Sequence, residues 1–77
     1  MAIKTIKEGR MLCRKVRKST ILRINDKMHI FYSPVLREYS VEELQTNEEE
    51  DYSRWFTTMI TTNQEELARF LKGKEVK

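Results

Sequence analysis

The chain has 77 residues, one cysteine and a formal net charge of +3, with 39% hydrophobic and 35% charged residues. A chain of this length holds one domain with one modest core, which excludes a cofactor domain beside a substrate domain, and a single cysteine excludes a disulfide framework or a cysteine-rich zinc site. We therefore expect residues 1–77 to form a single small domain. No stretch is long and apolar enough to span a bilayer and no signal peptide precedes Lys4, so we expect a cytoplasmic protein.

The N-terminal part of the chain predicts a short helix followed by a basic strand. Ile3 and Ile6 fall on one helical face within residues 2–8, and Gly9 follows as a residue that can end the helix. Residues 11–17 then predict a first strand.

The next segments predict a hairpin. Residues 20–25 and 28–33 alternate between apolar and polar residues, and Asn25-Asp26 between them tolerates the backbone of a tight turn. Pro34 ends the second of these strands.

The central part predicts a helical turn and a loop. Ser40 and Glu43 have the spacing of a capping box, so residues 41–45 are expected to form a short helical turn. An acidic loop is expected over residues 46–53 and a last strand over residues 54–60.

A second capping box, Thr62 with Glu65, predicts a C-terminal helix over residues 63–72 that Gly73 ends. Leu67, Phe70 and Leu71 form one apolar stripe along this helix. The expected fold class is α+β: a small antiparallel sheet of about four strands, with a short N-terminal helix and a C-terminal helix.

Charge is unevenly distributed. Residues 1–39 hold ten basic and three acidic residues (+7), whereas residues 40–77 hold five basic and nine acidic residues (−4). The basic cluster of residues 14–18 is interpreted either as an edge strand protected by cations or as a site for phosphates or an acidic partner. The acidic run is either a solvated loop or a partner-binding segment; it consists of Glu48, Glu49, Glu50 and Asp51.

The residues point to binding rather than to catalysis, and no catalytic, metal or cofactor site is expected. His29 lies in the middle of a predicted strand, Cys13 has no second sulfur nearby, and the adjacent acids lack the spacing of a Ca²⁺ loop. Arginine and aromatic side chains can together hold a nucleotide. The candidate ligand-binding residues are Arg14, Arg17, Lys18, Tyr52, Arg54 and Trp55; for the last of these, a plain core position is the alternative.

Residues 3–15, which include Lys7-Glu8-Gly9 before a basic segment, resemble the opening of a family of small phage proteins. The resemblance continues with the predicted hairpin, the helical turn, the acidic stretch and Trp55, and covers residues 2–60. The family includes the Thoeris anti-defence proteins, which act as sponges for cyclic ADP-ribose-type signals. The chain departs from it at Arg17-Lys18-Ser19, where the family usually has a tryptophan, and in its C-terminal helix.

The resemblance implies a homo-oligomer with pockets at or near subunit contacts, lined by Arg14, Arg17, Lys18 and Trp55. The first functional hypothesis is therefore a non-enzymatic phage protein that sequesters a small anionic nucleotide of host defence. The second is an inhibitor or adaptor that binds a host protein through its charged surfaces. The third is a nucleic-acid-binding accessory protein. This hypothesis is less favoured because the sequence predicts no basic helix.

Overall fold

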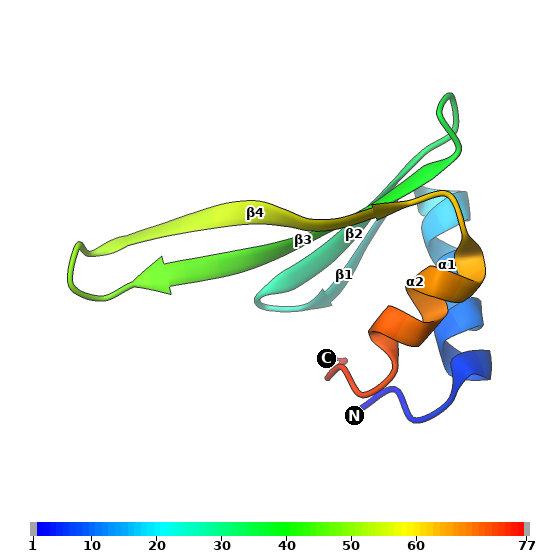
Figure 1. The fold of residues 1–77 in the computed structure, drawn as a ribbon, viewed down its shortest axis with the longest axis horizontal. Helices are drawn as coiled ribbons and strands as arrows, with labels where there is room; N and C mark the ends of the chain where they lie inside the picture. Colours follow the sequence, from blue (N-terminus) through cyan, green and yellow to red (C-terminus); the bar gives the residue numbers. More distant parts are fainter. Residues whose placement is uncertain (1, 77) are drawn as a thin grey trace.

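The protein is an antiparallel sheet with two helices on one of its faces. The computed structural model describes residues 2–76 (Figure 1). The elements in chain order are α1 (Ile6–Ser19), β1 (Ile21–Asn25), β2 (Met28–Ser33), β3 (Glu38–Asn47), β4 (Tyr52–Thr61) and α2 (Gln64–Leu71). The strands pair in the order β1-β2-β3-β4. The expected α+β class, with four antiparallel strands and a helix at each end, is confirmed.

The predicted N-terminal helix is present, but it begins at Ile6 and runs to Ser19 instead of covering residues 2–8, so the strand predicted over residues 11–17 is wrong. The N-cap of α1 is Thr5, whose hydroxyl accepts a hydrogen bond from the Glu8 amide (3.2 Å). Gly9 does not end the helix but lies inside it, because α2 crosses there: an added Cβ on Gly9 would lie 2.9 Å from the Ala68 carbonyl oxygen. Gly9, Cys13 and Val16 are buried at helical spacing.

The β1–β2 hairpin confirms the sequence prediction. Residues Asn25 to Met28 connect the strands, and the Asn25 side chain accepts a hydrogen bond from the Lys27 amide (2.8 Å). On β2, Met28 and Ile30 are buried on the side of the helices, while Phe31 points to the other side and is exposed.

Strand β3 contradicts the predicted helical turn at residues 41–45. Ser40 pairs with Phe31 on one side and with Ile60 on the other, so β3 hydrogen-bonds with both neighbours along this stretch. Pairing on two sides, together with the burial of Tyr39 and Val41 at a spacing of two, outweighs the local capping-box preference.

The last two elements agree with the sequence apart from their bounds. Strand β4 begins at Tyr52, so the acidic loop is shorter than the predicted residues 46–53. The cap of α2 is Asn63 rather than Thr62, because its side chain accepts from the amides of Glu65 and Glu66. Gly73 follows the helix with a φ of +89°, a left-handed conformation that suits glycine.

The core lies between the two helices and the sheet face that they cover. Its largest fully buried side chains are Ile24, Ile30, Leu67, Leu71, Val16, Val41 and Cys13. The ends of the described chain also meet at this side, where Ala2 pairs with Glu75. The sequence correctly places Leu67 and Leu71 on the apolar stripe of the C-terminal helix.

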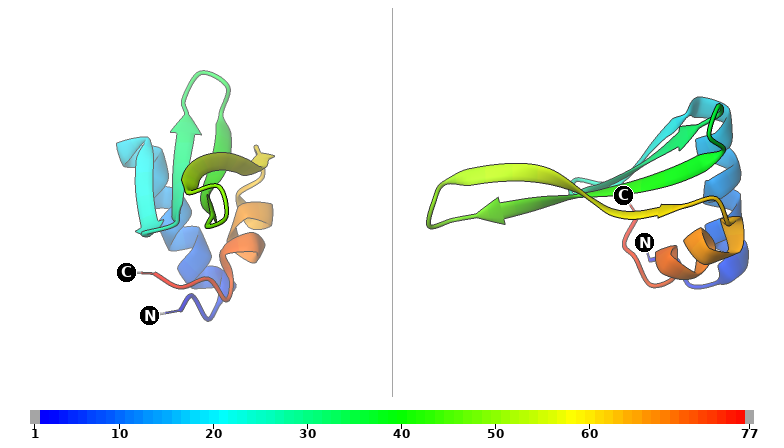
Figure 2. Two further views of the ribbon diagram at one scale, coloured as in Figure 1. Left: turned by 90° about the vertical axis from the view of Figure 1, so that its left-hand side faces the viewer. Right: turned by 45° about the horizontal axis from the view of Figure 1, so that its top comes forward.

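The β3–β4 hairpin extends well past the helices (Figures 1 and 2). The last residue of β3 that pairs with β2 is Glu43, opposite Met28. The next residue, Leu44, donates its amide to the Lys27 carbonyl oxygen of the β1–β2 connection (2.8 Å). From Gln45 onward β3 pairs only with β4, out to Asn47 opposite Tyr52. We call residues 45–54 the arm. Neither α1 nor α2 covers the arm, so its strands have no second layer to pack against (Figure 1).

Candidate anion-binding site

The basic residues near the end of α1 lie on its exposed side. Because the segment is helical rather than extended, Arg14, Lys15, Arg17 and Lys18 all stand outside the buried stripe. Arg10, one turn before Arg14, forms an ion pair with Glu65 of α2. Within residues 2–76, no ion pair joins the other four side chains to a carboxylate, so their charges are available to a ligand.

Arg17 also lies beside a second group of polar side chains, which come from β2, the β2–β3 turn, β3 and the start of α2. A hollow of about 170 Å³ is lined by Arg17 of α1, Tyr32 of β2, Arg37 of the β2–β3 turn, Tyr39 of β3, and Thr62 and Gln64 at the start of α2. We call it the Arg17–Arg37 hollow. Two arginine residues from separate elements therefore line one small space.

The aromatic rings hold this hollow in shape. The Arg17 guanidinium lies over the Tyr32 ring, 5.8 Å from its centroid, and the Tyr32 and Tyr39 rings are 4.9 Å apart. Tyr39 is 3% exposed. Burial raises the pKa of the Tyr39 phenol, while the nearby Arg17 guanidinium lowers it. The phenol is therefore protonated at neutral pH and can donate a hydrogen bond.

The helix end beside the hollow adds little positive potential of its own. The Asn63 side chain already accepts from the Glu65 and Glu66 amides, and both residues place a carboxylate in the first turn of α2. The Glu65 carboxylate is paired with Arg10. Attraction for an anion at this place must therefore come from Arg17 and Arg37.

A broader basic hollow adjoins the first, since Arg17 lines both. It is open to solvent, has a volume of about 370 Å³ and is lined by Arg14, Arg17 and Lys18. Three of the six predicted ligand-binding residues thus lie together. The two hollows form a small site that opens onto a wider cationic surface.

The other three predicted ligand-binding residues lie elsewhere and are not brought to the basic cluster. Tyr52 and Arg54 are on the arm, on the sheet side that also carries Phe56, over whose ring the Arg54 guanidinium lies at 5.4 Å. Trp55 points to the opposite side and stacks on His29, with ring centroids 4.0 Å apart. Trp55 is 44% exposed, so it is not a core residue either.

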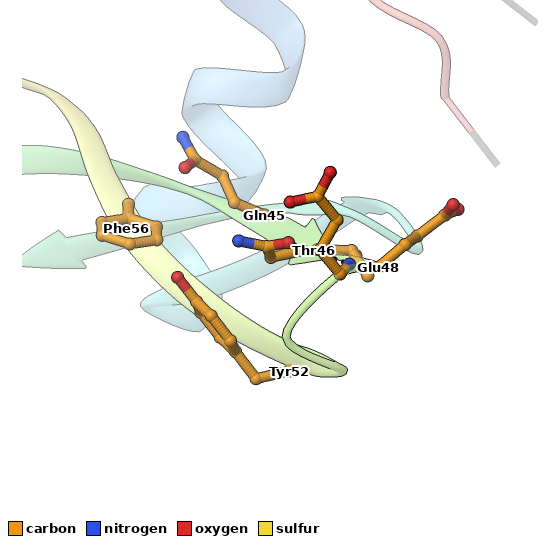
Figure 3. A pocket seen from close by; sticks show the side chains of 7 residues that line it. Gln45, Thr46, Glu48, Tyr52 and Phe56 are labelled. Atoms are coloured by element: carbon orange, nitrogen blue, oxygen red, sulfur yellow. Dashed lines mark hydrogen bonds between the residues drawn. The ribbon is translucent and has the colours of Figure 1, made fainter.

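Tyr52 instead lines a hollow near the end of the arm (Figure 3). Its volume is about 370 Å³, and Gln45, Asn47 and Phe56 are among its other lining residues. Glu48 and Glu49 stand at its rim. This hollow is acidic and aromatic, which does not suit a phosphate.

The acidic run forms the turn of the arm, at the far end of the molecule from the helices (Figure 1). The Asn47 side chain accepts from the Glu49 and Glu50 amides, and Asp51 has a φ of +52°. Glu48, Glu49, Glu50 and Asp51 are all exposed. Their role in binding a partner protein remains a prediction.

Arg17 is the one residue lining the Arg17–Arg37 hollow that the sequence assigned to ligand binding; the other five are Tyr32, Arg37, Tyr39, Thr62 and Gln64. Tyr32 pairs with Tyr39 across the β2–β3 hairpin, and Arg37 lies in the turn between them with a φ of +56°. The signal available was the alternation of residues 38–43, which continues the hairpin pattern past Pro34. The capping-box interpretation of Ser40 concealed it.

The two nucleophilic or titratable groups singled out in the sequence have structural partners. His29 Nε2 lies 2.8 Å from a Glu42 carboxylate oxygen, and its ring contacts Phe31 edge-on, with centroids 4.7 Å apart. Cys13 is fully buried in the core, and burial raises the pKa of its thiol to about 11.

No family model, curated protein or solved structure matches the chain. Two segments on which the phage-family resemblance depends take other conformations, since residues 11–17 are helical and residues 41–45 lie in a strand. Among residues 2–76, no three His, Cys, Asp or Glu side chains gather as metal ligands would. Neither helix in that range is long and apolar enough to cross a membrane.

Proposed function

We propose that the protein is a non-enzymatic binding protein for a small phosphate-bearing ligand of the nucleotide class, held at the Arg17–Arg37 hollow. The supporting observation is the convergence of Arg17 and Arg37 from separate elements on one small space beside Tyr32 and Tyr39. Arginine matches phosphate because its planar fork donates two parallel hydrogen bonds.

The dimensions suit one phosphate in the hollow and the rest of the ligand outside it. A space of about 170 Å³ is smaller than the roughly 300–1,000 Å³ of ordinary small-molecule sites, so it can hold only part of a ligand. A second phosphate or a ribose would extend over the open basic hollow, where Arg14 and Lys18 lie. This arrangement favours a ligand with more than one anionic group.

Calorimetric titration tests the proposal. The probes are cyclic ADP-ribose isomers, cyclic di- and trinucleotides, and inorganic pyrophosphate. If Arg37 bonds a phosphate, Arg37→Ala removes a charged hydrogen bond and weakens binding by about 10- to 100-fold. Arg17→Lys should also weaken binding, because the charge stays but the fork is lost.

Arg69→Ala is the matched control, because Arg69 is an exposed arginine of α2 that does not line either hollow. It should bind as the unmodified protein does. Equal losses for Arg37→Ala and Arg69→Ala would mean that net charge alone governs binding. No binding of any probe would refute the proposal.

A second candidate, binding to a nucleic-acid backbone, is favoured by the helical conformation of the basic segment. Lys7, Arg14 and Lys18 recur along the exposed side of α1, which supplies the basic helix that the sequence did not predict. Backbone binding releases counterions, so the affinity would fall steeply with salt. A nucleotide held mainly by two arginines should show a much weaker salt dependence.

A further inference from the structure

The side of the sheet turned away from the helices carries a row of exposed apolar residues. Ile21, Phe31, Ser40 and Ile60 are paired in register across all four strands. The exposed fractions of Ile21, Phe31 and Ile60 are 48%, 37% and 59%. Neither helix lies on this side, which is visible in the two views of Figure 2. Large apolar side chains grouped in this way mark interaction surfaces.

An ordered aromatic cluster adjoins the row. The rings of Trp55, His29 and Phe31 follow one another, with centroids 4.0 Å apart for the first pair and 4.7 Å for the second. The Glu42 carboxylate fixes the His29 ring from below the cluster (2.8 Å). These side chains are already held by one another, so less rotamer freedom is lost when a partner covers them. We call Ile21, His29, Phe31, Trp55 and Ile60 the outer face.

The chain exposes more surface than a compact monomer of its mass. Its accessible surface is 5593 Å², whereas a compact monomer of this mass exposes about 5,000 Å². The uncovered sheet side and the arm account for this extra surface.

The charges of this side identify the kind of partner. Arg23 is paired with Asp26, and the Glu42 carboxylate is hydrogen-bonded to the His29 ring and accepts from the Thr57 hydroxyl, so these charged groups already have partners within the chain. Glu38 is the other charged residue whose strand position puts it on this side. A nucleic-acid backbone would find no uncompensated cation here, among the described residues, whereas an apolar protein surface would meet little unbalanced charge.

A second copy of the chain satisfies these conditions best. Each copy has a net charge of +3, with the exposed bases concentrated on α1. When two copies meet through the sheet side that faces away from the helices, their basic helices lie on opposite outer surfaces. This arrangement keeps the like charges far apart, which contact through any helix-bearing surface would not.

We propose that two copies associate through the outer face as a two-fold symmetric pair of stacked sheets. With the axis parallel to the strands, β1 of one copy lies over β4 of the other. Ile21 then faces Ile60 of the second copy, and the aromatic cluster lies between the sheets. Face-to-face sheets of this kind pack about 10 Å apart. The Arg17–Arg37 hollow stays outside the interface, so this proposal does not rest on the proposed function.

Sedimentation of the full chain tests the arrangement. The mass of one chain is 9.3 kDa, and we expect the unmodified protein to sediment at twice that mass at micromolar concentrations. Ile60→Glu places a charge opposite Ile21 of the second copy and should weaken association by at least 100-fold. Met11→Glu is the matched control, because Met11 is 51% exposed on α1, and it should leave the dimer intact.

Two further measurements distinguish a loss of association from a loss of folding. Circular dichroism shows whether Ile60→Glu keeps the fold, and Ile21→Glu repeats the experiment from the other edge of the sheet. Trp55 is the single tryptophan, so its emission should shift to shorter wavelength as the unmodified protein is concentrated. A monomer throughout, or a dimer that Met11→Glu breaks and Ile60→Glu does not, would overturn the proposal.

Discussion

Strand β3 begins in the helix-covered body of the molecule and ends in the arm, so one strand exists in two environments. Val41, in the body, is fully buried, whereas Thr46, in the arm, is exposed. A strand pair in the body has a second layer against which to bury its apolar side chains, and the arm has none. The arm depends mainly on backbone pairing between its two strands, so each of its side chains should contribute little to the stability of the fold.

A bulge lies in the body shortly before the arm begins. The register of β3 and β4 shifts between Val41 and Glu42, where Thr58 is the extra residue of β4. Its hydroxyl donates to the Val41 carbonyl oxygen (3.4 Å). A bulge bends its strand and increases the local twist, which turns the arm away from the helices.

The largest expected effect comes from a core truncation in the body. Ile30→Ala removes a fully buried side chain of β2 and should lower the free energy of unfolding by about 2–5 kcal/mol. Thr46→Ala on the arm should stay within about 0.5 kcal/mol. Urea denaturation measures both. Comparable losses for the two variants would contradict the contrast between body and arm.

Alkaline pH should also lower the stability of the body. Burial raises the pKa of the Cys13 thiol from 9.0 to about 11 in the folded chain. The buried neutral thiol therefore stabilises the fold fully below pH 9, and this stabilisation is lost as the pH rises through 11. The free energy of unfolding should fall by about 2–3 kcal/mol over that interval. The raised pKa of Tyr39 acts in the same direction.

Cys13→Ala is the control for the alkaline loss, which should become clearly smaller in this variant. The remaining loss is assigned to Tyr39. A pH profile that Cys13→Ala leaves unchanged would show that the thiol is not the titrating group.

A substitution at the contact between α1 and α2 should lower the stability by a smaller amount. Gly9→Val places methyl groups where the Ala68 backbone already lies and should destabilise the chain by about 1–3 kcal/mol. Met11→Val introduces the same side chain at an exposed position of α1, and it measures the propensity cost of a β-branched residue alone. Thermal unfolding compares the two variants, and equal melting temperatures would mean that α2 can move aside.

The smallest effect is expected from shortening the arm. Replacing residues 46–53 with Asn-Gly joins Gln45 to Arg54 through a two-residue turn of the kind that hairpins favour. The free energy of unfolding should change by less than about 1 kcal/mol, because no core residue is removed. Trp55 is retained and reports unfolding by fluorescence. A large loss would mean that the arm stabilises the body.

Local signals were sufficient for part of the fold. The β1–β2 hairpin follows from alternation and Asn25-Asp26, and α2 follows from its leucine stripe and an N-terminal cap that the sequence placed one residue early. For the site, the clustering of Arg14, Arg17 and Lys18 follows from their closeness in the chain, whatever structure they adopt. Arg37 joins them only through the β2–β3 turn, which the sequence analysis did not place.

The sequence by itself therefore determined the class of fold, the β1–β2 hairpin, the C-terminal helix and the basic segment, because each depends on residues within a few positions of one another. Tertiary structure decided the rest. Gly9 remains in a helix because another helix crosses it, and Ser40 remains in a strand because strands pair on both of its sides. Trp55 was separated from the basic residues by the two-sided geometry of the sheet, which places alternate side chains on opposite faces.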